Sequence, residues 1–109
     1  MTNQQRKTLE NRANILKALA HPSRLLMVEE LAKGERCVCE LQRLVGADIS
    51  TVSKHLSVMK NVGLVEDDKR GLQVFYNLVS PCVMNFFECV EAVIAARKST
   101  RATATGTAK

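Results

Sequence analysis

Two cysteines one residue apart, Cys37 and Cys39, are the residues of this 109-residue chain best suited to chemistry. Paired thiolates bind soft ions such as Zn(II), Cd(II), Cu(I) and As(III), and a thiol pair can also be oxidised. A single cysteine often packs simply as a small apolar side chain, but charged residues, Glu35, Arg36 and Glu40, surround this pair. We therefore interpret the pair as ligand-binding or redox-active thiols.

The one-residue spacing limits how the two thiols can act together if both lie in a regular helix. Residues two apart in a helix are rotated by about 200°, so their side chains diverge. Joint chelation by Cys37 and Cys39 is then expected to require an irregular or unwound first turn. Ligand binding would distort this helix and misplace the helix that follows it.

Two further cysteines, Cys82 and Cys89, lie in the region of a predicted last helix and share one of its faces. Their separation along the helix axis is about 10.5 Å, so this pair cannot hold one ion without a thiol from another helix or subunit. They could complete the Cys37/Cys39 site, form a separate site, or pack at a dimer interface. The candidate ligands of a soft ion are therefore all four cysteines.

The composition indicates one domain in a reducing compartment. The chain begins with the polar sequence MTNQQRK, and no apolar run approaches the roughly 18 residues of a membrane span. Cysteines without a secretory signal favour free thiols in the cytoplasm over a disulfide framework. The net charge of +5 is compatible with nucleic-acid binding, although Arg97, Lys98, Arg101 and Lys109 supply four of these charges near the C-terminal end.

The cysteine pair begins a predicted helix-turn-helix over residues 35–63. Gly46 can adopt a positive φ at the end of the first helix, Asp48 is a good N-cap for the second, and Gly63 ends it. Small hydroxyls, a cation and an imidazole on the outer face of the second helix suit the DNA major groove. The candidate DNA-binding residues on this helix are Ser50, Thr51, Ser53, Lys54 and His55.

Two helices are predicted before this motif. An apolar stripe with helical spacing runs through residues 6–19, and a second helix is expected over residues 22–32. Pro22 separates the two because it disfavours helical geometry in His21 and fits the first turn of a new helix.

A β-hairpin of the wing type is predicted after the motif. The residues at 64–66 and 72–78 are β-prone, and 67–71 contains turn residues. This arrangement places Lys69 and Arg70 at the tip of the hairpin, where they would lie beside a phosphate backbone if the second helix of the motif enters the groove.

Ser80 and Pro81 indicate the start of a last helix, which we expect to end at about Lys98. The domain then covers residues 1–98, and the polar segment 99–109 is expected to be a disordered tail. The fold class is mainly α with a β-hairpin, a winged helix-turn-helix of order α-α-α-α-β-β-α. The apolar faces of the first and last helices exceed the needs of one small core and predict a homodimer through these two helices.

The segments ERCVCEL, ISTVSKHLSVMKNVGLV and KRGLQVFYNL resemble the ArsR/SmtB family of metal-responsive bacterial repressors, over about residues 10–95. The resemblance implies a dimeric winged-helix repressor that a thiophilic metal or metalloid releases from DNA. The chain is most similar to the arsenic-responsive members, which have a third cysteine where this chain has Gln42. Cadmium- and lead-responsive relatives add N-terminal cysteines, and none precedes Cys37 here. The carboxylate/His site on the last helix of zinc-sensing relatives has no match, because no histidine follows His55.

The expected function is that of a transcriptional repressor released from its double-stranded DNA operator by As(III) or Sb(III). A repressor responsive to Cd(II) or Pb(II), or one that senses thiol oxidation or persulfides, is the alternative within the same fold. We expect no enzymatic activity, because no base or oxyanion-loop motif accompanies any cysteine, and no organic cofactor.

Overall fold

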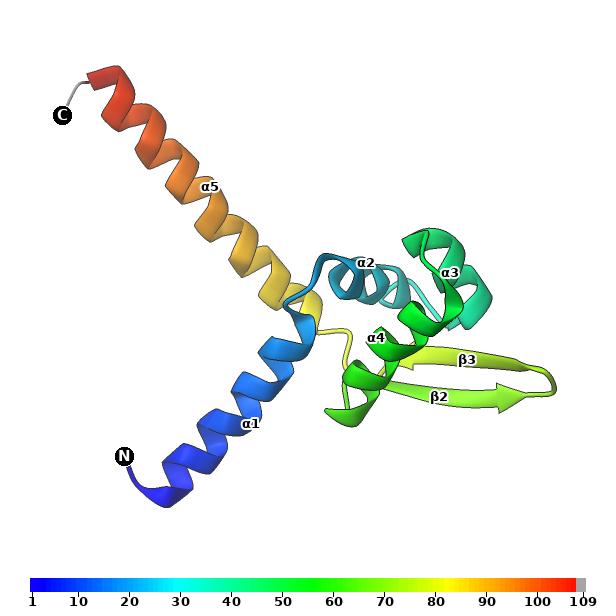
Figure 1. Cartoon of the computed structure of the whole chain (residues 1–109). Helices are drawn as coiled ribbons and strands as arrows, with labels where there is room; N and C mark the ends of the chain where they lie inside the picture. Colours follow the sequence, from blue (N-terminus) through cyan, green and yellow to red (C-terminus); the bar gives the residue numbers. More distant parts are fainter. Residues whose placement is uncertain (108–109) are drawn as a thin grey trace.

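The computed structural model describes the backbone of residues 1–107 and the side chains through Ser99. Five helices and a three-stranded antiparallel sheet form a winged helix-turn-helix, with the first and last helices extending away from the body that holds the sheet (Figure 1). The predicted order of four helices, a hairpin and a final helix is confirmed, with one additional short strand.

Helix α1 spans Asn3–Leu19 and begins earlier than predicted. The Thr2 backbone N–H donates to Gln5 Oε1 at 2.8 Å, and the Gln5 N–H donates to Thr2 Oγ1 at 3.1 Å. This reciprocal capping box satisfies two backbone donors and fixes the helix start without any apolar burial. Helix α2 follows at Pro22–Leu31, with His21 as its N-cap as the X-Pro junction predicts.

The helix-turn-helix consists of α3, Val38–Val45, and α4, Ile49–Asn61. Gly46 ends α3 with a left-handed φ of 75°, and Asp48 Oδ1 accepts a 2.7 Å hydrogen bond from the Thr51 N–H as the N-cap of α4. Hydrogen bonds from Thr51, followed by that from Ser50, lower the pKa of Asp48 below its usual value. The predicted turn and cap are confirmed.

The sheet has the strand order β1-β3-β2, formed by Arg36–Cys37, Gln73–Leu78 and Val65–Arg70. The predicted turn at 67–71 is wrong, because those residues up to Arg70 pair with β3 and the turn contains only Gly71 and Leu72. Gly71 has a φ of 61°, which suits a two-residue hairpin turn. Three of the polar side chains that suggested a longer turn form ion pairs instead: Asp67 with Lys60 of α4, and Arg70 with Asp68 and Glu35.

The core lies between α2, α3, α4 and the sheet and is apolar throughout the described side chains. Its fully buried members come from all three of these helices and from β2: Met27, Val28, Leu41, Val52, Leu56, Met59 and Val65. This packing fixes α4 against the rest of the body, so that its opposite face remains outside.

Helix α5 spans Val83–Thr107 and is preceded by a tight turn at Ser80–Cys82. It begins later than predicted, because the first N–H groups bond to carbonyls three residues earlier. It also continues past Lys98 to Thr107, so it is longer than predicted. No glycine or proline lies between Lys98 and Gly106, and alanine is the strongest helix former. Residues 108 and 109 lie outside the described part of the chain.

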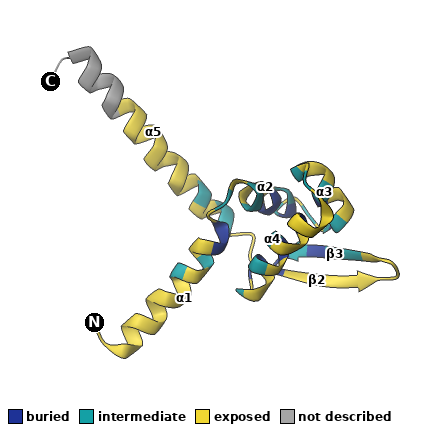
Figure 2. Cartoon of the chain, viewed as in Figure 1, coloured by how far each residue is buried: buried dark blue, intermediate teal, exposed yellow. Residues whose placement is uncertain are grey.

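The N-terminal part of α1 and the described part of α5, up to Ser99, are mostly exposed, as Figure 2 shows. Within residues 1–107, none of the helices combines the length and apolar character that crossing a bilayer requires.

Candidate nucleic-acid interface and thiol site

Cys37 and Cys39 are joined by a disulfide in this structure, with 5.4 Å between their Cα atoms. The predicted divergence of two thiols in one regular helix does not apply here, because only Cys39 lies within the helix. Cys37 has extended backbone angles, with φ −77° and ψ 159°, and lies in β1 as the residue before α3. The two sulfurs therefore meet across the start of the helix while Val38–Val45 stays regular.

The two sulfur atoms have different surroundings. Cys37 is 5% exposed, whereas Cys39 is exposed to solvent. Cys37 Sγ accepts the Glu40 N–H at 3.4 Å, and the Cys37 N–H donates to Glu40 Oε1 at 3.0 Å. Cys37 thus caps α3, and a change at its sulfur acts directly on the first helix of the helix-turn-helix.

Cys82 and Cys89 are both exposed and unpaired. Cys82 lies in the turn before α5 and not on the helix as predicted, and its Sγ is 2.9 Å from Ser80 Oγ. Among the side chains that the structure describes, no group of three or more Cys, His, Asp or Glu is placed to hold a metal ion. One chain therefore brings together only two of the four predicted sulfur ligands.

The outer face of α4 carries four of the five predicted DNA-binding residues in exposed positions: Ser50, Thr51, Ser53 and Lys54. Ser50 Oγ donates to Asp48 Oδ1 at 3.0 Å, so its hydroxyl is oriented by the cap. This polar face near a helix N-terminus has the residue types that read base edges and contact phosphates.

His55 lies on a different face from these residues. Its Nδ1 accepts the Arg24 Nε–H at 3.1 Å, and its ring centroid is 4.4 Å from that of His21. The position is three residues after Val52 and four before Met59, so it shares the side of α4 that packs on the body. The prediction that His55 belongs to the outward DNA-binding face is wrong in this respect.

Burial lowers the pKa of His55 below its usual value near 6.5, and the neighbouring His21 and Arg24 lower it further. The unfolded chain then binds a proton at this site more readily than the folded chain. We expect the free energy of unfolding to fall on acidification from about pH 7.5 to about pH 5.5. Urea unfolding at both pH values should show a smaller fall for His55→Gln, which keeps an acceptor for Arg24. If the free energy of unfolding falls equally in the wild type and in His55→Gln, the pH dependence comes from another group.

The two predicted basic residues of the hairpin differ in their contacts. Lys69 is exposed, and no ion pair of its side chain occurs among the described residues. Arg70 binds both carboxylate oxygens of Glu35, each at 2.7 Å, and its Nε–H donates to Asp68 at 2.9 Å. Arg70 is therefore held by two carboxylates of the protein in this structure, and its contact with a DNA phosphate stays a prediction.

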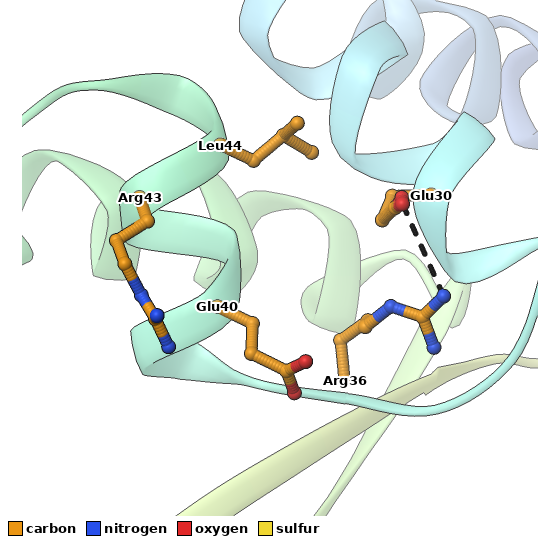
Figure 3. Close-up of a pocket in the computed structure, with 5 residues that line it drawn as sticks. All are labelled: Glu30, Arg36, Glu40, Arg43 and Leu44. Atoms are coloured by element: carbon orange, nitrogen blue, oxygen red, sulfur yellow. Dashed lines mark ion pairs between the residues drawn. The ribbon is translucent and has the colours of Figure 1, made fainter.

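A surface hollow of about 410 Å³ is lined by residues of α2 and α3 and by Arg36 of β1 (Figure 3). Arg36 contributes to its wall and is 3.9 Å from Glu30, while the Arg43 Nε–H donates to the Cys39 carbonyl at 3.4 Å. The lining contains two carboxylates and two guanidinium groups, together with Leu44. Its opposite charges balance, so it favours neither a cation nor an anion.

Comparisons with known proteins agree with this architecture. A family model described as "Bacterial regulatory protein, arsR family" matches residues 21–67. A biofilm growth-associated repressor of Xylella fastidiosa is 40% identical over 77 residues, which are 67% of this chain and 68% of the relative. The chain belongs to the ArsR family.

Other ArsR-family proteins show the same relation. The cadmium resistance transcriptional regulatory protein CadC of Listeria innocua is 32% identical, over 72% of this chain and 57% of the relative. The homodimeric winged helix-turn-helix DNA-binding domain of Mb0332 from Mycobacterium bovis has a TM-score of 0.76 at 29% identity, covering 92% of this chain and 93% of that one. ArsR-family proteins are transcriptional regulators and not enzymes, and the expected partners, operator DNA and a second copy, are those of such domains.

Proposed function

We propose that this ArsR-family regulator is a homodimeric, cytoplasmic repressor whose affinity for operator DNA is controlled at Cys37 and Cys39. The observation that carries this proposal is the meeting of the two sulfurs at the cap of α3. Helix α3 packs on α4, so a change at the cap reaches the helix with the exposed polar face.

The DNA contacts proposed for each subunit follow from this placement. Helix α4 enters the major groove with Ser50, Thr51, Ser53 and Lys54, and Lys69 of the hairpin contacts the phosphate backbone. His55 supports α4 from behind through Arg24 and reads no base.

The inducer we propose is a thiophilic ion, arsenite or Sb(III) before Cd(II) or Pb(II). Two converging sulfurs with one exposed member suit an ion that binds through few thiolates. The relative CadC is named for cadmium resistance, but in this chain neither the cysteine pair nor its described neighbours include the additional ligands of a larger site. A further ligand would come from a small thiol, or from Cys82 or Cys89 of the second subunit.

The route from ion to DNA requires no unwinding of α3. An ion bound by both sulfurs ties the end of β1 to the first turn of α3, so the start of the helix shifts relative to its position in the reduced protein. Cys37 is also paired with Phe75 of β3, so the same shift reaches the hairpin. A tenfold loss of operator affinity requires only about 1.4 kcal/mol of coupling, within the usual range for allosteric proteins.

Sensing of thiol oxidation is a second candidate, favoured by the direct bond between the two sulfurs. Two thiols would form one disulfide and release two protons and two electrons, which a small-molecule disulfide accepts as it becomes two thiols. The same link between β1 and the first turn of α3 would then transmit the change.

The test uses reduced protein and a duplex that the protein selects from a random-sequence pool, here termed the selected duplex. Fluorescence anisotropy should show at least a roughly tenfold loss of affinity on addition of sodium arsenite in the presence of excess reductant. Release only by a small-molecule disulfide, with loss of two Ellman-reactive thiols, would replace the ion by oxidation as the signal. Release by neither reagent would overturn the proposed switch.

A further inference from the structure

The guanidinium group of Arg70 donates from all three of its nitrogen atoms to carboxylates of the protein. It forms a two-pronged pair with Glu35, bonds Asp68, and lies 4.7 Å above the centre of the Phe75 ring. Two parallel N–H···O bonds match the planar fork of arginine, which binds phosphate in the same way. Glu35 therefore occupies the groups that a DNA phosphate would use.

The partners of Arg70 are tied to the cysteine pair. Glu35 lies two residues before Cys37, and the strand that follows it, β1, pairs with β3 through Cys37 and Phe75. Cys37 is thus linked to both partners of Arg70: to Glu35 along the chain, and to Phe75 through the pairing of β1 with β3. Joining Cys37 to Cys39 connects the end of β1 to the first turn of α3 and fixes the segment from Glu35 onward against the hairpin.

We infer that Glu35 is a positioning residue that keeps Arg70 away from DNA while Cys37 and Cys39 are joined. The inference rests on the proposed function, and it adds a second route from the thiol pair, through the hairpin. When the pair opens, β1 is less constrained, and Arg70 exchanges Glu35 for a phosphate. The side chains of Arg70 and Glu35 are 50% and 36% exposed, so water competes with the pair and a phosphate can displace the carboxylate.

The hairpin supplies a matched control. Glu66 lies on β2, is exposed, and forms no ion pair among the described residues. Glu66→Gln removes the same charge from the DNA-facing part of the chain as Glu35→Gln does, without freeing Arg70. A difference between the two variants therefore reports the Glu35–Arg70 pair and not the general loss of negative charge.

The experiment measures DNA affinity against salt for the full chain with its cysteines joined by a small-molecule disulfide or bridged by arsenite. Glu35→Gln should raise affinity for duplexes of any sequence roughly two- to fivefold over Glu66→Gln. It should also steepen the slope of log affinity against log salt by about 0.9 for each Arg70 that reaches a phosphate. Adding Arg70→Gln should abolish both effects. Equal behaviour of Glu35→Gln and Glu66→Gln, or effects that persist in the Arg70→Gln background, would overturn the inference.

The wild type separates this inference from the proposed function. If joining the cysteines does not weaken binding to the selected duplex, or if Lys54→Ala leaves its affinity unchanged, the proposed function fails and the inference fails with it. If the wild type is released and Lys54→Ala loses affinity, equal results for Glu35→Gln and Glu66→Gln reject only the role of Glu35.

Discussion

Cys37→Ser and Cys39→Ser variants are expected to bind the selected duplex as tightly as the reduced wild type and to ignore arsenite. Each substitution removes one of the two sulfurs that meet at the start of α3, so neither chelation nor a disulfide can join them. Serine is a favoured N-cap, and its hydroxyl at position 37 can accept the Glu40 N–H in place of Sγ. The fold and the placement of α4 are therefore retained while the response is lost.

The measurement is anisotropy of the labelled duplex with and without arsenite. The wild type should lose about tenfold in affinity, and each variant should change by less than about twofold, which corresponds to well under 1 kcal/mol. Cys82→Ser and Cys89→Ser test whether the second subunit completes the site, since both thiols are exposed and free in the single chain. A response that also disappears in Cys82→Ser or Cys89→Ser would indicate a site completed by the second subunit. If arsenite still releases the Cys37→Ser/Cys39→Ser double variant from the duplex, the ligand-binding site lies at Cys82 and Cys89 near α5.

The helix-turn-helix was predictable because its signals are local. Gly46 ends α3, Asp48 begins α4, and Gly63 follows the end of α4. Each acts through its own backbone or through a hydrogen bond to a residue three positions away. The apolar spacing of α4 also predicted which face packs inward, apart from His55 at the edge of that face. Here the sequence alone identified both the position and the orientation of the element.

The details of the thiol site were not predictable, because they depend on contacts between distant parts of the chain. Cys37 is extended because β1 pairs with β3, and a two-residue strand leaves no periodic pattern. Arg70 and Glu35 form an ion pair although they are 35 positions apart, and no spacing rule predicts such a pair. Arg24 and His55 are 31 positions apart. The sequence showed only that these residues are charged or polar and lie near the predicted helix-turn-helix and hairpin.

The apolar face around α1 and α5 leads to the second large prediction. The apolar faces that predict a dimer include five side chains that are exposed in the single chain: Leu9, Leu16, Phe86, Val90 and Ile94. A hollow of about 740 Å³ between the two helices and α2 is lined by Leu16, Phe86 and Val90 among others. Helices α1 and α5 diverge within one chain (Figure 1), so these side chains have no partner in the monomer among the residues described.

Phe86→Glu is expected to convert the dimer to a monomer and to abolish tight binding to the selected duplex. Burying a large apolar side chain contributes about 1.5–3 kcal/mol, and a two-fold interface loses this contribution twice while gaining two buried charges. Sedimentation velocity at micromolar concentration should show one species of half the wild-type mass. Circular dichroism should remain unchanged, because Phe86 is 42% exposed and the core of the single chain does not depend on it.

Asn14→Glu provides the control for added charge, because Asn14 is exposed on the polar side of α1 away from Leu16. This variant should remain dimeric and bind DNA as the wild type does. A wild type that sediments as a monomer at micromolar concentration would contradict the interface. So would a Phe86→Glu variant that remains a dimer, since the subunits would then meet through another surface. In a dimer joined at α1 and α5, a two-fold axis relates the two copies of α4, and each copy is expected to bind one half-site of the DNA. Loss of the interface therefore removes the contribution of one half-site even though each α4 and each cysteine pair is intact.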